Sequence, residues 1–378
     1  MIYFDNSATG GFKPHAVIES ASTAIRYLLA NPGRSSHRLS LTGMQTVVNT
    51  RTAFSEYFSC PFERVIFTKN CTESLNTAIF GTLKVGGHVI TTVFEHNSVL
   101  RPLTALKEKG LINLDVVFPS EDKNLVSAIK EKIRDDTYLI VCNSVSNVNG
   151  EILPIKEIGE LAKKHSLIFL VDGAQGGGHI DLNLEENNIS ILCLAGHKGL
   201  YGIMASGILL FNDKIDIEPL IFGGTGSETF NLNQPSDYPE KLESGTINLP
   251  AVASLFEGLN YVKANRENFA KHLYSMSEKL LNGLKQIEKV KIYSKPNECG
   301  IVAFSLENMP SGKVSDLLNS EYDIAVRGGF HCAPLMHKFL GTEKDGLVRA
   351  SLAVQNSSRE IAFFLYAVSE ISKRKEQE

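Results

Sequence analysis

The sequence predicts an α/β protein with a large, mostly parallel sheet followed by a smaller α+β unit. Short apolar runs alternate with amphipathic stretches over the first two thirds of the chain, which is the pattern of strands connected by helices. After about residue 250, this alternation gives way to one long helical stretch and several shorter strands. The composition of the 378 residues, 43% hydrophobic and 21% charged, is ordinary for a globular protein with a large core.

The strands expected in the large sheet are short apolar runs of the kind that parallel sheets bury on both faces. Residues 167–171, Leu-Ile-Phe-Leu-Val, are a typical case, because no polar residue interrupts them. In chain order the expected strands are 64–68, 88–92, 114–118, 138–142, 167–171, 190–194 and 207–211, and the helices between them include 72–82, 97–109, 124–133 and 155–164.

The second unit is expected to open with a long helix and to close with another, with short strands between them. The boundary is placed near Gly245 to Pro250, after a Gly-rich loop at 223–226 and a polar loop at 227–240. The long helix covers about 250–287, the strands lie near 290–293, 301–306, 324–327 and 347–352, and the closing helix covers about 357–374. The expected domains are 15–250, which is large, and 251–378, which is small and includes the N-terminal segment 1–14.

Charge and composition give no reason to expect a nucleic acid or a membrane as partner, because the formal net charge is only -4. No apolar run approaches the roughly 20 residues that a spanning helix needs. Residues 1–6 have neither a basic stretch nor an apolar core, so no signal peptide is expected and the cytoplasm is the expected location. The six cysteines form no C-x-x-C pair, so no metal site is expected. The cysteines are expected to be reduced thiols.

Asp172 and Lys198 are the first candidates for chemistry, because each follows an apolar strand at the point where α/β sheets bind ligands. A carboxylate that pairs with a pyridine nitrogen and a lysine that links covalently are what pyridoxal 5'-phosphate requires. Taken alone, Asp172 is more often a turn residue and Lys198 a surface lysine. Their flanks favour the cofactor, since Gln175 lies within reach of its phenolic oxygen and His197 within reach of a phosphate.

A phosphate site is expected where Cys71 and Thr72 open a helix, because helix N-termini bind anions. An ordinary helix cap explains these two residues equally well. The Gly-rich loop at 223–227 lacks the Lys-Ser/Thr of a P-loop, so nucleotide binding is not expected. His96 follows the strand 88–92 and is a candidate to stack on the pyridine ring, although a lone histidine is more often structural. Asn147 also follows a strand and can be a plain turn residue.

With these positions in order, the chain resembles the class V aminotransferase-fold enzymes that use pyridoxal phosphate, and among them the cysteine desulfurases and selenocysteine lyases. The resemblance covers essentially the whole chain and implies a fold type I transferase. It implies that Asn31 lies in a substrate-side loop and that Arg349 binds the substrate α-carboxylate. Thr246 is implied to reach the phosphate bound by another subunit, which implies a homodimer. For the cofactor it implies contacts from Cys71, Thr72, His96, Asn147, Asp172, Gln175, His197 and Lys198.

The sequence departs from the family pattern at a few positions that bear on cofactor affinity and turnover more than on the fold. Ala195 stands where a Ser or Thr hydroxyl usually helps to hold the phosphate, and Phe330 stands where a histidine is common. Ile203, Ala205 and Lys241 replace a proline, a glycine and an arginine respectively.

Cys332 is the candidate nucleophile, because Arg327 and His331 nearby are cations that can lower the pKa of a thiol. Composition alone would favour a buried core cysteine. The segment, however, resembles the Arg-x-Gly-x-His-Cys-Ala loop of group II cysteine desulfurases. The resemblance implies conversion of L-cysteine to L-alanine, with Lys198 moving the Cα proton, His96 assisting, Arg327 and Arg349 binding substrate, and the sulfur passing to Cys332 as a persulfide for an acceptor protein.

Other activities remain open. A selenocysteine lyase acting on L-selenocysteine shares nearly all of these residues. A cysteine sulfinate desulfinase or a small-substrate transaminase would use the same cofactor, and a transaminase has no need of Cys332. A weakly catalytic sulfur-relay or binding protein is a further alternative, which Ala195 and Phe330 keep open.

Overall fold

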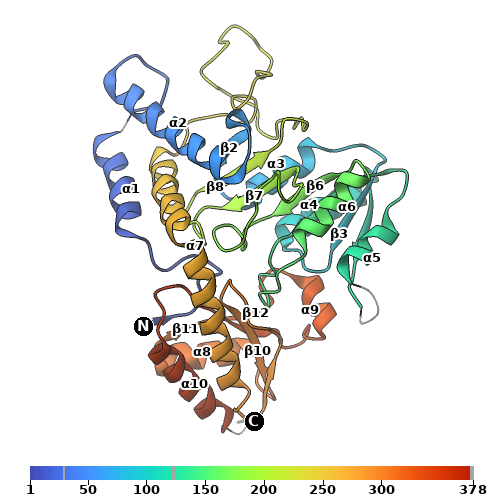
Figure 1. Ribbon diagram of the computed structural model, residues 1–378, viewed down its shortest axis with the longest axis vertical. Coiled ribbons are helices and arrows are strands. Elements are labelled where there is room, and N and C mark those ends of the chain that lie inside the picture. Colours follow the sequence, from blue (N-terminus) through green and yellow to red (C-terminus); the bar gives the residue numbers. More distant parts are fainter. Residues whose placement is uncertain (29, 121–123, 375–378) are drawn as a thin grey trace.

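The computed structural model describes residues 1–28, 30–120 and 124–374. It consists of a large unit around a seven-stranded sheet and a small unit around a four-stranded sheet, as Figure 1 shows. The α/β fold class predicted from the sequence is confirmed, because all but one of the strands in the large sheet run parallel.

The large sheet has the strand order β2-β8-β7-β6-β5-β3-β4. Strand β8 is antiparallel to both of its neighbours, β2 and β7, and the other pairs are parallel. Every strand predicted for this sheet is confirmed to within one residue at each end. The bounds are β2 Val65–Thr68, β3 His88–Thr92, β4 Asn113–Val117, β5 Thr137–Asn143, β6 Ile168–Asp172, β7 Ile191–Ala195 and β8 Gly207–Phe211, with a short 3-10 turn at Phe62–Arg64.

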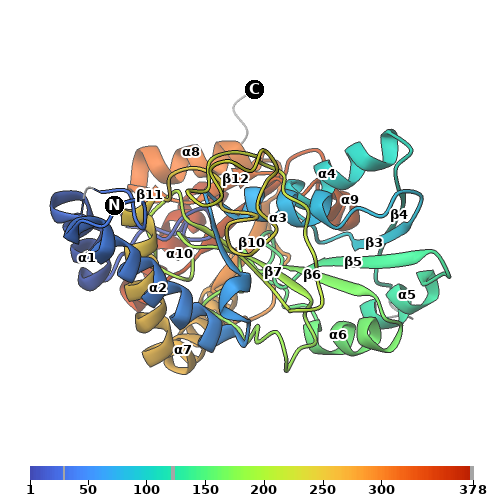
Figure 2. The same cartoon turned by 90° about the horizontal axis from the view of Figure 1, so that it is seen from above.

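Helices cover both faces of this sheet, because alternate residues of each buried strand point to opposite sides. In β6, Phe169 and Val171 pack in one hydrophobic cluster and Leu170 in another. Figure 2 shows α4 and α6 on opposite sides of the sheet. On one face lie α3 (Cys71–Gly81) and α4 (Asn97–Glu108), and on the other α2 (Arg38–Phe58), α5 (Leu125–Lys132) and α6 (Ile155–Lys164).

The small unit is built on an antiparallel sheet with the order β12-β13-β10-β9, and the N-terminal strand β1 pairs separately with β11. Its core includes Phe4 together with residues of α7, α8 and α10. The predicted single strand at 324–327 is wrong, because the chain changes partners at Val326: β11 pairs with β1, and β12 pairs with β13. The bounds are β1 Ile2–Tyr3, β9 Val290–Ile292, β10 Ile301–Leu306, α8 Ser311–Tyr322, β11 Ile324–Ala325, β12 Arg327–Gly329, α9 Pro334–Leu340, β13 Leu347–Ser351 and α10 Ser358–Ser372.

Helix α7 (Leu249–Leu284) connects the two units, as Figure 1 shows. Its first part packs on α1 (His15–Tyr27) and α2, and its later part belongs to the small core. It begins at Asn248, whose side chain accepts a hydrogen bond from the amide of Ala251. Helix α7 crosses the boundary expected after residue 250, so the division into domains 15–250 and 251–378 remains a proposal. Residues 29, 121–123 and 375–378 of these expected domains lie outside the described residues. Among the helices that the structure describes, none has both the length and the apolar character needed to cross a membrane.

Candidate active site

The carboxyl ends of β2, β3, β5, β6 and β7 lie at the same edge of the large sheet, so the segments that follow them converge there. They form a pocket of about 110 Å³. This pocket brings together every sequence-predicted cofactor residue except Thr246. Its lining comprises Asn70, Cys71, Thr72, Leu75, His96, Ser98, Asn143, Val145, Asn147, Asp172, Ala174, Gln175, Ala195, His197 and Lys198.

Asp172 and Lys198 both line this pocket, and the charge of Asp172 acts on the Lys198 amine. The Asp172 Oδ1 atom accepts hydrogen bonds from the amide of Ala174 at 2.9 Å and from the Cys71 thiol at 3.6 Å. Burial lowers the pKa of the Lys198 amine, and the negative charge of Asp172 acts in the opposite direction. The amine is therefore easier to deprotonate than that of an ordinary lysine.

The N-terminus of α3 supplies the polar end of the pocket. The helix is capped by Asn70, whose side chain accepts from the amide of Glu73 at 2.9 Å. The Thr72 hydroxyl lies 2.8 Å from the Ser98 hydroxyl, which in turn lies 2.9 Å from His96 Nδ1. Ser98 was missed in the sequence, where it is simply a residue in the first turn of a helix. The backbone amides of the first turn, with these hydroxyls beside them, suit an anion such as a phosphate.

His96 begins α4, and its Nδ1 atom accepts a hydrogen bond from the amide of Ser98 at 3.0 Å. Burial lowers the pKa of the His96 ring, with Asp172 opposing this effect. A neutral imidazole whose Nδ1 accepts carries its proton on Nε2. The ring can therefore stack on an aromatic ligand as an uncharged group.

Glu95, beside His96, was not singled out in the sequence. It is fully buried, and its Oε1 atom accepts from the Thr92 hydroxyl at 2.6 Å and from the amide of Asn143 at 3.1 Å. Its Oε2 atom is buried without a hydrogen-bond partner. Burial raises the pKa of the Glu95 carboxyl to about 8, so the group is mostly protonated at neutral pH.

Residues 7–13 lie across the segment that carries Lys198. The Gln175 side-chain amide donates to the carbonyl of Ser7 at 3.0 Å, and His197 Nδ1 lies 3.0 Å from the Thr9 hydroxyl. The His197 carbonyl also accepts from the Lys13 amine at 2.9 Å. Burial lowers the pKa of His197 to about 4, with further lowering from Lys198 and Lys13. His197 is therefore neutral, so any contact it makes with a phosphate is a hydrogen bond and not an ion pair.

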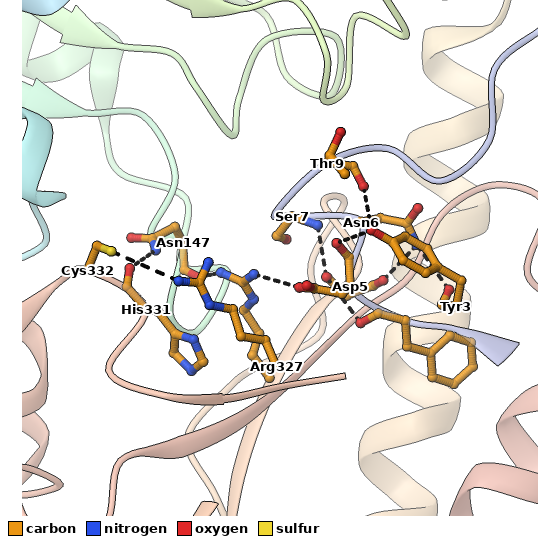
Figure 3. A network of polar contacts seen from close by, with 12 residues as sticks. Tyr3, Asp5, Asn6, Ser7, Thr9, Asn147, Arg327, His331 and Cys332 are labelled. Carbon is orange, nitrogen blue, oxygen red and sulfur yellow. Dashed lines mark hydrogen bonds and ion pairs between the residues drawn. The ribbon is translucent and has the colours of Figure 1, made fainter. Parts of the chain in front are cut away.

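Cys332 lies in the loop between β12 and α9, and it is the one exposed thiol among the six cysteines, all of which are described. Its Sγ atom is 4.0 Å from Arg327 Nη2, a contact drawn in Figure 3. His331 and Cys332 both have left-handed backbone conformations, with φ of 48° and 56°. The large unit holds this loop, because the Asn147 side chain donates to the His331 carbonyl and the Asn97 amide donates to the Cys332 carbonyl, both at 2.7 Å.

The expectation that His331 supplies positive charge to Cys332 is wrong. The His331 ring is buried, and its Nε2 atom donates to the carbonyl of Leu347 at 3.1 Å. Burial lowers the pKa of this ring well below its usual value, and the neighbouring Arg349 lowers it further. A ring that stays neutral cannot stabilise a thiolate by charge, so Arg327 is the cation next to Cys332.

Arg349 is paired in register with Arg327 in the small sheet and is buried. Its Nη1 atom donates to the carbonyl of Asn147 at 2.8 Å, and its Nη2 atom lies 2.9 Å from Asp5 Oδ1. The Nε atom of Arg349 and the Oδ1 atom of Asn147 are both buried without a hydrogen-bond partner. Asn147 thus connects the pocket, the loop of Cys332 and Arg349.

The structure does not bring Asn31 and Thr246 to the Lys198 pocket. Both line a separate cleft of about 450 Å³ that also includes Val47, Phe67 and Leu242. Near this cleft, the segment 220–232 carries apolar side chains that are largely exposed, including Phe222, Phe230 and Leu232.

A family model, curated relatives and solved structures each match nearly the whole chain. The family model described as aminotransferase class V matches residues 2–364. A probable cysteine desulfurase of Pyrococcus abyssi is 32% identical over 99% of this chain and 94% of its own length, and a cysteine desulfurase of Salmonella agona is 28% identical over 96% and 91%. The solved apo structure of a cysteine desulfurase from Thermococcus onnurineus superposes with a TM-score of 0.91 at 31% identity, covering 98% of this chain and 94% of that one.

Proposed function

The chain belongs to the class V aminotransferase family and is an enzyme of the cysteine desulfurase type, and from this premise we propose that Cys332 takes the sulfur of L-cysteine as a persulfide. The observation that carries this proposal is the position of the one exposed thiol, which lies 4.0 Å from a guanidinium nitrogen of Arg327. The thiolate is the form of cysteine that attacks sulfur. The other five cysteines are buried.

The pocket residues fit pyridoxal 5'-phosphate as the cofactor. Asp172, which is buried, and Lys198 line the same pocket, the N-terminus of α3 offers amides and hydroxyls, and Asn147 Oδ1 is a buried polar atom without a partner. When bound, the cofactor supplies the electron sink for charge that develops at Cα. The residues that would hold it are Asp172 at the pyridine nitrogen, Lys198 at the covalent linkage, His96 on the ring face, Gln175 and Asn147 at the ring edge, and Cys71, Thr72 and His197 at the phosphate.

The remaining residues bind substrate and move protons. Arg349 would hold the α-carboxylate of L-cysteine with Arg327 beside it, because a guanidinium matches a carboxylate in two hydrogen bonds. Lys198, whose pKa burial lowers, would remove the Cα proton. His96 would hold the proton of the substrate thiol.

The sulfur transfer balances without any other reactant. The Cys332 thiolate forms a bond to the substrate sulfur, the bond between that sulfur and the substrate carbon breaks, and the electron pair remains with the carbon. A proton then completes L-alanine, and Cys332 keeps the sulfur as a persulfide. An exposed Cys332 would allow an acceptor protein to collect it.

The proposal extends to the assembly and its location. A homodimer would place Asn31 and Thr246 beside the pocket of the second copy, which would explain their distance from Lys198 in their own chain. The exposed apolar side chains of 220–232 support such a contact. The six free cysteines support the cytoplasm, where thiols stay reduced.

The test compares the native enzyme, loaded with pyridoxal phosphate, with its Cys332→Ser variant. L-alanine and sulfide formed from L-cysteine are measured with a reductant present, and the visible absorbance checks cofactor loading. We expect the variant to load normally but to lose about 100-fold in rate, which corresponds to about 2.7 kcal/mol of barrier, because a hydroxyl is far too basic to attack sulfur.

Cys60→Ser is the matched control, since Cys60 is buried away from the pocket and its thiol donates to the carbonyl of Phe211, a contact that a hydroxyl can keep. This control should retain the native rate. Near-native alanine production by Cys332→Ser would make Cys332 a bystander and favour another reaction of the family. Survival of L-selenocysteine turnover alone would instead identify a selenocysteine lyase.

A further inference from the structure

Asp5 contacts the guanidinium of Arg349 from a part of the chain that lies 344 residues away. Its Oδ1 atom is 2.9 Å from Arg349 Nη2, and Figure 3 shows Asp5 opposite the loop of Cys332, with arginine side chains between them. Arg349 is 1% exposed and Asp5 22%. A cation this deeply buried requires a partner, and Asp5 is the acidic group that the structure gives it.

Arg349 has hydrogen-bond donors that neither Asp5 nor Asn147 occupies. A guanidinium has five N–H donors. One donor of Nη1 goes to the carbonyl of Asn147 and one of Nη2 goes to Asp5, while Nε is buried without a partner. The two occupied contacts fix the plane of the group, and the remaining donors suit a carboxylate that binds in two hydrogen bonds.

The charge of Asp5 also offsets a local repulsion. Burial lowers the pKa of Arg349, and Asp5 opposes this effect. Arg327, the register partner of Arg349 across β12 and β13, lowers the pKa a little further. Without Asp5, the buried Arg349 would face Arg327 with a backbone carbonyl as its fixed contact. The side chain would then be less firmly oriented.

The backbone on both sides of Asp5 is held independently of its side chain. The Ser351 amide donates to the carbonyl of Phe4 at 2.7 Å, and the Ser7 amide donates to the Ser351 hydroxyl at 2.9 Å. Asn6 contacts the Ser351 carbonyl through its side-chain amide, also at 2.9 Å. Removing the Asp5 carboxylate should therefore leave the N-terminal segment in place.

We propose that Asp5 is a positioning residue that orients Arg349 for the α-carboxylate of an amino-acid substrate, so that the N-terminal segment sets the affinity for that carboxylate. The inference rests on the carboxylate-binding role proposed for Arg349. It does not depend on what happens to the sulfur.

The experiment measures binding to the enzyme loaded with pyridoxal phosphate, through the change in its visible absorbance. The two probes are L-alanine and ethylamine, which is L-alanine without its carboxylate. Asp5→Ala should weaken L-alanine binding about tenfold and leave ethylamine within about twofold. Asp5→Asn keeps an oxygen acceptor without the charge, so its affinity for L-alanine should lie between those of Asp5→Ala and the native enzyme. For L-cysteine, Asp5→Ala should raise KM about tenfold and change kcat by less than about threefold.

Asn6→Ala is the matched control, because it removes three side-chain hydrogen bonds from the same segment, none of them to Arg349. It should leave L-alanine binding within about twofold. Equal L-alanine affinity in Asp5→Ala and the native enzyme would overturn the inference, as would tighter binding, which would make Asp5 a competitor for Arg349. A native enzyme that does not favour L-alanine over ethylamine would overturn it too. An enzyme that shows the Asp5 effect but forms no sulfide would disprove only the proposed reaction.

Discussion

At the scale of single residues, burial controls the charge of the groups around the pocket. It lowers the pKa of His96, His197 and Lys198, and it raises that of Glu95. The two histidines are therefore neutral at pH 7, and the Glu95 carboxyl is mostly protonated and so also neutral. Arg327, which is next to Cys332, and its register partner Arg349 carry positive charge on the small sheet.

The free energy of unfolding of Glu95→Gln should exceed that of the native protein by an amount that grows as the pH rises. The pKa of Glu95 is about 8 in the fold against 4.5 ordinarily, so its protonated form stabilises the fold below pH 4.5 and this contribution is lost as the pH rises through 8. A glutamine oxygen can keep both hydrogen bonds that Glu95 Oε1 accepts. Urea unfolding should show its advantage growing by about 3 kcal/mol between pH 5 and pH 8.

The control is Glu56→Gln, since Glu56 lies on the exposed face of α2. It should show no such growth with pH. A constant difference between Glu95→Gln and the native protein at both pH values would mean that Glu95 is ionised in the fold.

Some of the site was readable from the sequence, because its residues follow strands or stand beside a cation in the chain. Asp172, Lys198 and Cys332 were identified in this way. The contact of Asp5 with Arg349 and that of Thr72 with Ser98 depend on segments that meet only in the fold. The charge expected on His331 failed for a related reason, since neighbours in sequence do not reveal burial.

At the scale of elements, the strands of the large sheet were predictable because they are continuous apolar runs. Helices α1 and α2 were not predicted. The buried face of α1 consists of Val17, Ala21 and Ala24, which form a narrow stripe against α7, and α2 buries polar residues such as Thr50 and Arg51. Arg51 pairs with Glu243 at 2.9 Å, so a helix face that looks solvent-exposed in the sequence is partly internal.

Ser357→Ala should destabilise the protein by about 1 kcal/mol, because Ser357 and Glu360 form the capping box that begins α10. The Ser357 hydroxyl accepts from the Glu360 amide at 3.3 Å, and the Glu360 carboxylate accepts from the Ser357 amide at 2.6 Å. Urea unfolding measures the change. Ser320→Ala, on the exposed face of α8, should stay within about 0.5 kcal/mol, and an equal effect of the two substitutions would exclude a specific cap.

At the scale of the whole molecule, the separate cleft with Asn31 and Thr246 leads to a prediction about mass. Light scattering should give about twice the 41.5 kDa of one chain. Replacing Phe230 and Leu232, which are 99% and 100% exposed, with aspartate should shift the mass toward a single chain and weaken cofactor retention. Val85→Asp, at a site 71% exposed on another loop, should leave the mass unchanged. A native protein that is fully active at the mass of one chain would contradict the proposed dimer.

The pairing of β1 with β11 has a consequence for how this protein folds while a ribosome makes it. Ile2 and Tyr3 are made before the strands of the large sheet, but their partners Ile324 and Ala325 are made after them. The strands of the large sheet all lie within 65–211, so that sheet can assemble while the small unit is still being made. Asp5 meets Arg349 only after Arg349 has been made, 344 residues later. A growing chain can therefore form the pocket around Lys198 before Arg349 and Cys332 exist, which would delay the proposed sulfur chemistry until the small unit is made.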